Sequence, residues 1–175
     1  MTLKLELESV RLLARRLDEA GIGYASGGSG LLYSLGLSEQ VHDWDVTTDA
    51  PYEQVAAVLC GLPWAASPCG DYPFASSYRL TIADERLPID VIGQFAIHSG
   101  TGICRLPAFV STDWLGIRMG SPEVWAAAYT LMGRETKAEL LLSYLERSGA
   151  DRDAVQRLLS EPLPEPLRSR LLRLV

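Results

Sequence analysis

The sequence predicts an α+β fold, with a mixed β-sheet, helices packed on one face of that sheet, and further helices towards the C-terminus. Helical patterns alternate with β-prone runs in residues 1–120, whereas residues 121–175 are helical in pattern. A hairpin-like pair of β-prone runs lies in the middle of the chain. A chain of 175 residues buries about 70% of its unfolded surface, which is enough for one domain. We therefore expect a core of residues 1–120, with a helical extension of residues 121–175 packed on it.

The first third of the chain predicts three helices and two strands. Residues 3–20 have apolar side chains at helical spacing, and we expect a strand at 22–25 to follow this helix. A glycine turn then leads into a second helix within 27–36. Residues 43–48, Asp-Trp-Asp-Val-Thr-Thr, are β-prone and alternate in character, so they predict a strand. A third helix is predicted within 49–61, because a proline lies in its first turn and a glycine ends it.

The middle of the chain favours strands, and the C-terminal part favours helices. Residues 76–82 and 87–92 predict a hairpin with a four-residue turn, and 103–106 and 115–119 predict further short strands. From Ser121 the chain is helical in pattern through a capped start and the run VWAAAYTLMGRETKAELLLSYL. Two short helical segments complete the chain on either side of EPLPEP.

Composition narrows the class of protein. The net charge of −6 provides no overall basic field, so a small molecule, cationic or metal-bound, is a better partner than long nucleic acid. Cys60, Cys69 and Cys104 lack the spacing of a zinc site or a disulfide framework, and we expect reduced thiols. We also expect a cytoplasmic protein, because the sequence shows neither a signal-peptide pattern nor a run of 18 apolar residues.

Three aspartates predict a metal site. If Asp43 and Asp45 lie on one strand, both carboxylates point to the same face, roughly 6.5 to 7 Å apart. Two carboxylates held so close repel each other, and a divalent cation such as Mg²⁺ or Mn²⁺ relieves the repulsion. Asp90 interrupts an apolar strand with a charge that is costly to bury without a partner. We therefore predict that the three aspartates hold a metal together.

A glycine turn precedes the acidic pair. Gly27 and Gly28 would let backbone N–H groups approach a phosphate closely, and Ser29 adds a hydroxyl. The turn has neither the Gly-Lys-Ser/Thr of a Walker motif nor the spacing of a dinucleotide fingerprint. A short glycine turn that faces two carboxylates suits the terminal phosphates of a metal-bound nucleotide.

These residues together resemble the nucleotidyltransferase superfamily, and in particular small bacterial members with a polymerase-β-like fold. The shared pattern is a strand, Gly-Gly-Ser, a helix ending in Leu-Gly, an Asp-x-Asp pair and a later strand aspartate. The resemblance covers roughly residues 22–140 and extends to the sequence Gly-Arg-Glu-Thr-Lys that ends at Lys137. It implies a nucleotidyltransferase-like mixed sheet. It also implies the transfer of a nucleoside monophosphate, expected to be AMP, from a metal-bound nucleoside triphosphate to a hydroxyl.

The resemblance also implies roles for residues. Asp43 and Asp45 would hold the metals, and Asp90 would hold one metal and activate the acceptor hydroxyl. Gly27, Gly28 and Ser29 would contact the terminal phosphates, and Lys137 would reach a phosphate. The chain departs from many relatives in having Glu-Gln-Val-His before the acidic pair, where they have an arginine. It also lacks a large acceptor-binding half, which a homodimer would supply.

Several residues have simpler interpretations. The glycine pair alone is more often an ordinary turn, and Asp43 alone could cap a strand. His42 is interpreted as structural or exposed, and Trp125 as a core or interface aromatic. Arg79 could meet a phosphate or form a cross-strand ion pair. The alternative function is a catalytically lapsed member of this fold that binds a nucleotide or a partner protein, and a purely structural protein is the third hypothesis.

Overall fold

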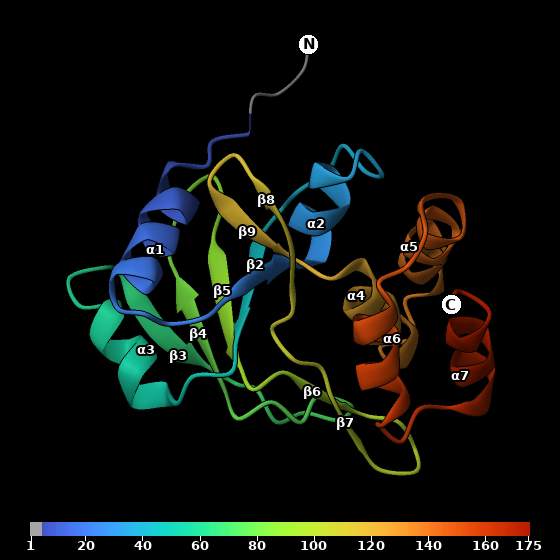
Figure 1. Cartoon of the computed structure of the whole chain (residues 1–175). Helices are drawn as coiled ribbons and strands as arrows, with labels where there is room; N and C mark the ends of the chain where they lie inside the picture. Colours follow the sequence, from blue (N-terminus) through green and yellow to red (C-terminus); the bar gives the residue numbers. More distant parts are fainter. Residues whose placement is uncertain (1–4) are drawn as a thin grey trace.

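The computed structural model describes residues 5–175, which form an α+β fold (Figure 1). The helices are α1 (Glu8–Glu19), α2 (Gly28–Ser34), α3 (Tyr52–Val58), α4 (Pro122–Leu131), α5 (Glu135–Ser148), α6 (Arg152–Leu159) and α7 (Glu165–Leu172). The strands are β1 (Ala25–Gly27), β2 (Trp44–Thr48), β3 (Trp64–Ser67), β4 (Tyr78–Ile82), β5 (Ile89–Gly93), β6 (Ala96–His98), β7 (Ile103–Arg105), β8 (Val110–Trp114) and β9 (Ile117–Gly120). Within residues 5–175, no helix is both long and apolar enough to cross a lipid bilayer.

The main sheet is mixed, as predicted. Its strand order is β3-β4-β5-β2-β1-β9-β8, and β6 pairs with β7 in a separate small sheet. The pairs β2–β5 and β1–β9 are parallel, whereas the other neighbours in the main sheet are antiparallel. The predicted hairpin is the β4–β5 pair, which places β5 directly beside β2. The two strands that carry the acidic residues are therefore neighbours at the centre of the sheet.

The two faces of the sheet differ in chemistry because side chains alternate along each strand. Val46, Leu80 and Val91 are buried in the hydrophobic core, together with Leu13 and Leu17 of α1. Helices α1 and α3 pack beside each other on this side of the sheet (Figure 1). The intervening residues of β2 and β5 point to the opposite face, where the polar side chains gather.

Helix α4 lies beside the polar face of the sheet. Ser121 caps its first turn by accepting a hydrogen bond from the amide of Val124, and Pro122 begins it, as the sequence predicts. The helix is buried on nearly all sides, which fits its apolar composition. Trp125 packs so closely on β1 that a Cβ atom on Gly27 would lie 1.9 Å from its ring. The glycine therefore allows the helix to approach the strand.

The structure corrects several expected boundaries. The predicted helical run from Ser121 divides into α4 and α5, because Gly133 adopts a φ of +74° between them. The first helix begins at Glu8, while residues 3 and 4 of its predicted range lie outside the described residues. The first strand begins at Ala25 and not at Ile22. The amide of Ile22 instead donates a hydrogen bond to the carbonyl of Leu17 at the end of α1.

Three strands were not predicted from the sequence. They are β3, β6 and β8. β3 and β8 form the two edges of the main sheet, and neither has a buried side chain. Their sequences lack the apolar alternation that identifies a strand with one buried face, and β6 has only three residues.

Candidate active site

The fold brings the three predicted aspartates together. Asp45 in β2 is the register partner of Asp90 in β5, and Asp43 lies just before β2. Because the two strands are parallel and in register, the carboxylates of Asp45 and Asp90 point to the same face. One carboxylate oxygen from each of the three residues lies within 4.8 Å of the others. Asp43 is exposed, Asp45 is half-buried and Asp90 is buried.

The electrostatics of this cluster favour a divalent cation. Burial, followed by the charges of Asp43 and Asp90, raises the pKa of Asp45 to about 7, while Arg79 and Arg134 oppose the shift. Carboxylate oxygens are ligands that Mg²⁺ and Mn²⁺ prefer. The oxygens around one Mg²⁺ lie within roughly 4.2 Å of one another, since each Mg–O distance is about 2.1 Å. The three oxygens lie within 4.8 Å of one another, so small movements of the side chains would arrange this donor set around such an ion.

Asp90 is held by two hydrogen bonds from β4. Arg79 donates from Nη2 to Oδ2 at 2.6 Å, and Thr81 donates from Oγ1 to Oδ1 at 2.7 Å. Ser67 of β3 lies 2.7 Å from the Thr81 hydroxyl and extends the network. Of the two interpretations of Arg79, the structure therefore shows the cross-strand ion pair, although its guanidinium also lines the adjacent cavity.

The glycine turn contacts the acidic pair directly. Gly28 adopts a φ of +61°, and a Cβ atom there would lie 2.0 Å from Oδ2 of Asp45. Ser29 donates a hydrogen bond from Oγ to the backbone carbonyl of Asp43 at 3.3 Å. Trp44, between the two aspartates, is fully buried on the other side, where its indole donates to the hydroxyl of Ser26 at 2.9 Å. The turn and the carboxylates thus form one surface, as predicted from the sequence.

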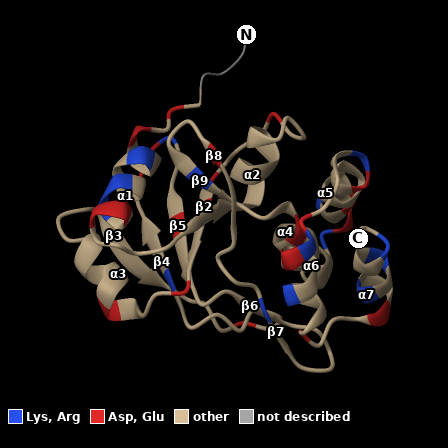
Figure 2. Cartoon of the chain, viewed as in Figure 1, with Lys and Arg blue, Asp and Glu red and all other residues tan. Residues whose placement is uncertain are grey.

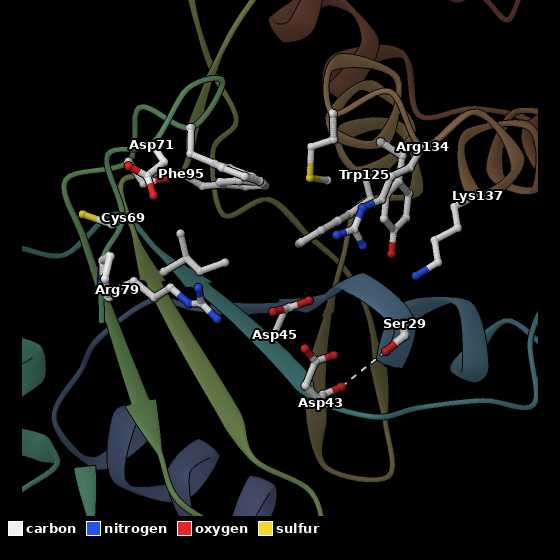
Figure 3. Close-up of a pocket in the computed structure, with 16 residues that line it drawn as sticks. Ser29, Asp43, Asp45, Cys69, Asp71, Arg79, Phe95, Trp125, Arg134 and Lys137 are labelled. Carbon is white, nitrogen blue, oxygen red and sulfur yellow. Dashed lines mark hydrogen bonds between the residues drawn. The ribbon is translucent and has the colours of Figure 1, made fainter. Parts of the chain in front are cut away.

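A cavity of about 310 Å³ lies above this surface (Figure 3). Its lining includes Ser29, Asp43 and Asp45. Arg134 and Lys137 lie on the side of the helices, whereas Cys69, Asp71 and Arg79 lie on the side of the β3–β4 loop and β4 (Figure 3). The apolar part of the lining includes Phe74, Ile92, Phe95, Trp125, Tyr129 and Met132. The cavity is therefore cationic at its helical wall, acidic at the base and mixed in charge at the loop wall.

Sequence reasoning identified some of the lining but missed the rest. Lys137 was predicted and lines the cavity, where its Nζ lies 5.4 Å from the centroid of the Tyr129 ring. Trp125 is buried, as predicted, yet its ring also lines the cavity. Arg134 was missed, although its position one helical turn before Lys137 could have indicated a second cation on the same wall. Asp71 lies in a loop that has no sequence signal.

Comparisons with known proteins identify the fold. No model of a known protein family matches the chain, and no curated protein matches it. A crystal structure of a proposed nucleotidyltransferase from Thermotoga maritima, TM1012, has a TM-score of 0.53 at 19% identity, over 81% of this chain and 92% of that one. ANT(2'')-Ia in complex with adenylyl-2''-tobramycin has a TM-score of 0.59 at 17% identity, over 95% of this chain and 97% of that one. The solution structure of the antibiotic-resistance factor ANT(2'')-Ia has a TM-score of 0.55 at 17% identity, over 94% of this chain and 89% of that one. The chain therefore has the fold of the nucleotidyltransferase superfamily, as predicted.

Proposed function

We propose that this protein is a metal-dependent nucleotidyltransferase that transfers a nucleoside monophosphate from a nucleoside triphosphate to a hydroxyl of a small molecule. We expect the transferred group to be AMP. The observation that supports this most strongly is the cluster of three carboxylates in contact with the glycine turn, at the base of a cavity that Ser29, Asp43 and Asp45 line. The fold supports the same class, because ANT(2'')-Ia was crystallised with an adenylylated aminoglycoside.

The carboxylates would hold the metal. Asp43 and Asp45 offer oxygens from one strand end, and Asp90 offers one from the neighbouring strand. Mg²⁺ or Mn²⁺, when bound, would neutralise phosphate charge and polarise the phosphorus–oxygen bonds of the nucleotide.

The remaining residues of the site would orient the triphosphate. Gly28 lies directly against the carboxylate of Asp45, and the adjacent Ser29 lines the cavity. On the opposite wall, Arg134 and Lys137 would attract the terminal phosphates, in place of the arginine that many relatives carry before the acidic pair. This arrangement would place the α-phosphate between the helical wall and the loop wall.

The reaction would then proceed by in-line displacement. A new bond forms between the acceptor oxygen and the α-phosphorus, the bond from that phosphorus to the bridging oxygen breaks, and pyrophosphate leaves. Asp90 would accept the proton of the acceptor hydroxyl, since it is the third carboxylate of the cluster and is held beside Asp45 by side chains of β4.

The cavity favours a small acceptor. Asp71 lies at the loop wall, so an amine on the acceptor would find a carboxylate there (Figure 3). Basic and acidic side chains are interspersed over α1 and the C-terminal helices, as Figure 2 shows, which is not the basic stripe that long nucleic acid requires. We further propose a cytoplasmic homodimer in which the second copy completes the acceptor side.

A pyrophosphate-release assay tests this function. The purified protein is incubated with Mg²⁺, each nucleoside triphosphate in turn, and a panel of amino sugars and other polyhydroxylated amines. We expect release with ATP and at least one acceptor, and a loss of at least 100-fold in Asp43→Asn and Asp90→Asn, with Asp153→Asn, at an exposed position in α6, as the matched control. Turnover that survives in Asp43→Asn would contradict the proposal.

The second candidate function is a nucleotide-binding module without catalysis. The ion pair between Arg79 and Asp90 favours it, because it occupies the carboxylate that would accept the proton. This candidate predicts binding of Mg²⁺–ATP with no release of pyrophosphate for any acceptor in the panel.

A further inference from the structure

Arg79 is placed to counter the charge of the acidic cluster. Its Nη2 lies 2.6 Å from Oδ2 of Asp90, while 42% of its side chain is exposed and lines the cavity. The hydrogen bond to Asp90, together with the charges of Asp45 and Asp43, raises the pKa of Arg79. The three carboxylate oxygens lie within 4.8 Å of one another, so the charge of the guanidinium acts on the whole cluster, although its ion pair is with Asp90.

Both oxygens of Asp90 already have a donor. Thr81 donates to Oδ1 and Arg79 donates to Oδ2, and each comes from the strand beside β5. A cation that reaches Asp90 must therefore share Oδ2 with the guanidinium or Oδ1 with the Thr81 hydroxyl, and in both positions it lies close to the guanidinium because the two oxygens belong to one carboxylate. A free divalent ion would lie close to a fixed positive charge, and the two repel each other in a partly buried site.

A metal-bound nucleotide meets the opposite situation. Mg²⁺ with a nucleoside triphosphate has a net negative charge, so Arg79 attracts the complex while it repels the bare ion. The exposed part of the side chain faces the cavity in which the phosphates would lie (Figure 3). Arg79 can thus oppose the binding of the free divalent ion and favour the binding of its nucleotide complex.

We propose that Arg79 is a positioning residue that neutralises the metal-free acidic cluster and makes divalent-metal binding depend on the nucleotide. This inference rests on the proposed function for the nucleotide, but the metal part stands on the geometry of the cluster alone. This role and a purely structural ion pair predict opposite changes in metal affinity when Arg79 is removed. If Arg79 only held Asp90 in place, its removal would weaken the metal site.

Manganese titration tests the proposal. Binding of Mn²⁺ alone, and of Mn²⁺ with α,β-methylene-ATP, is measured by electron paramagnetic resonance for the wild type and for Arg79→Met, Arg79→Gln and Arg79→Lys. We expect both neutral variants to bind Mn²⁺ alone about tenfold more tightly and the Mn²⁺–nucleotide complex about tenfold less tightly, since one unit charge near a divalent ion has effects of this order. Arg79→Lys should stay near the wild type.

A second cavity cation provides the matched control. Arg134 lies on the opposite wall of the cavity and acts on Asp45 only through its charge, so Arg134→Met should weaken binding of the complex and tighten binding of Mn²⁺ alone by less than Arg79→Met does (Figure 3). Thermal unfolding of each variant confirms that it is folded.

The outcomes separate the two proposals. Unchanged or weaker binding of Mn²⁺ alone in both neutral variants would overturn the role of Arg79. A wild type that binds Mn²⁺ but no nucleotide would contradict the proposed function. In that case, tighter Mn²⁺ binding in the neutral variants would still support the role of Arg79 as a counter-charge.

Discussion

A Cβ atom on Gly28 would lie 2.0 Å from Oδ2 of Asp45. Two segments that are distant in the sequence, a glycine turn and an Asp-x-Asp pair, are therefore in contact in the fold. The contact arises because β1 and β2 are antiparallel neighbours in which Gly27 is the register partner of Asp45. The turn must remain free of side chains for the carboxylate to keep its position.

We therefore expect Gly28→Ala to disable the site. The added methyl group must displace Asp45, and the φ of +61° adds backbone strain of roughly 1–2 kcal/mol. Calorimetric binding of Mg²⁺–ATP should weaken at least tenfold. Gly36→Ala is the matched control, because Gly36 has a φ of +71° and no atom within 4 Å of the added Cβ. Equally weakened binding in the two variants would show that backbone strain, and not the contact with Asp45, causes the loss.

The helical wall should determine nucleotide affinity. Lys137→Ala removes a cation from the wall opposite the carboxylates, so we expect the KM for ATP to rise about tenfold while kcat changes less than threefold. Arg173→Ala, in which an exposed cation is removed near the C-terminus, serves as the control. Steady-state kinetics with the acceptor in excess makes the measurement, and a fall in kcat without a change in KM would place Lys137 elsewhere in the mechanism.

The stability of the metal-free protein should depend on the ionisation of Asp45. Its pKa is raised from 3.8 to about 7, so between these values the folded protein retains a proton that the unfolded chain has lost. The free energy of unfolding therefore falls as the pH rises through this range, by at most about 4 kcal/mol at 1.36 kcal/mol per pKa unit. Asp45→Asn imitates the neutral carboxyl and should not show this fall.

Thermal unfolding in EDTA across this pH range provides the measurement. The Tm advantage of Asp45→Asn over the wild type should be largest near pH 8 and should disappear near pH 4. Addition of Mg²⁺ at pH 8 should stabilise the wild type and not the variant, because only the wild type keeps all three carboxylates. A constant difference in Tm at every pH would contradict the raised pKa.

A buried glutamate should stabilise the C-terminal helices without any part in the site. Glu123 accepts hydrogen bonds from the hydroxyl of Ser121 and from the backbone amide of Asp151, at 2.5 and 2.7 Å. Because Glu123→Ala leaves the buried donors without this acceptor, we expect a loss of about 1–3 kcal/mol in the free energy of unfolding. Urea unfolding measures it, with the exposed Glu85→Ala as the control. Surface substitutions typically change the free energy of unfolding by about 0.5 kcal/mol or less. A loss in that range for Glu123→Ala would show that water replaces the carboxylate.

The sequence predicted the parts of this fold that have one buried face. β4 alternates apolar and polar residues, β2 begins with the same alternation, β5 is an apolar run interrupted by Asp90, and α1 carries a clear apolar stripe. The edge strands β3 and β8 could not be predicted, because they pair with only one neighbour and bury none of their side chains. Gly133 divides the C-terminal helical run through its backbone conformation, which periodicity does not reveal.

The site shows the same division. The spacing of Asp43 and Asp45 predicts a shared face by strand geometry alone. The contribution of Asp71 depends on the path of an irregular loop, and that of Arg79 depends on the register of β4 against β5. Neither is encoded in a local pattern. Because of that register, Arg79 forms an ion pair with Asp90. It is therefore not a free phosphate ligand, which was the alternative interpretation.

The metal–nucleotide site is tested by calorimetric titration of ATP into the purified protein, with Mg²⁺ and with EDTA, for the wild type and Asp43→Asn. We predict binding that requires both Mg²⁺ and Asp43, with the carboxylates and the glycine turn as one metal–nucleotide site. Binding of equal affinity in EDTA or in Asp43→Asn would show that the nucleotide does not use the acidic cluster, and an absence of binding by the wild type would contradict the nucleotide site itself.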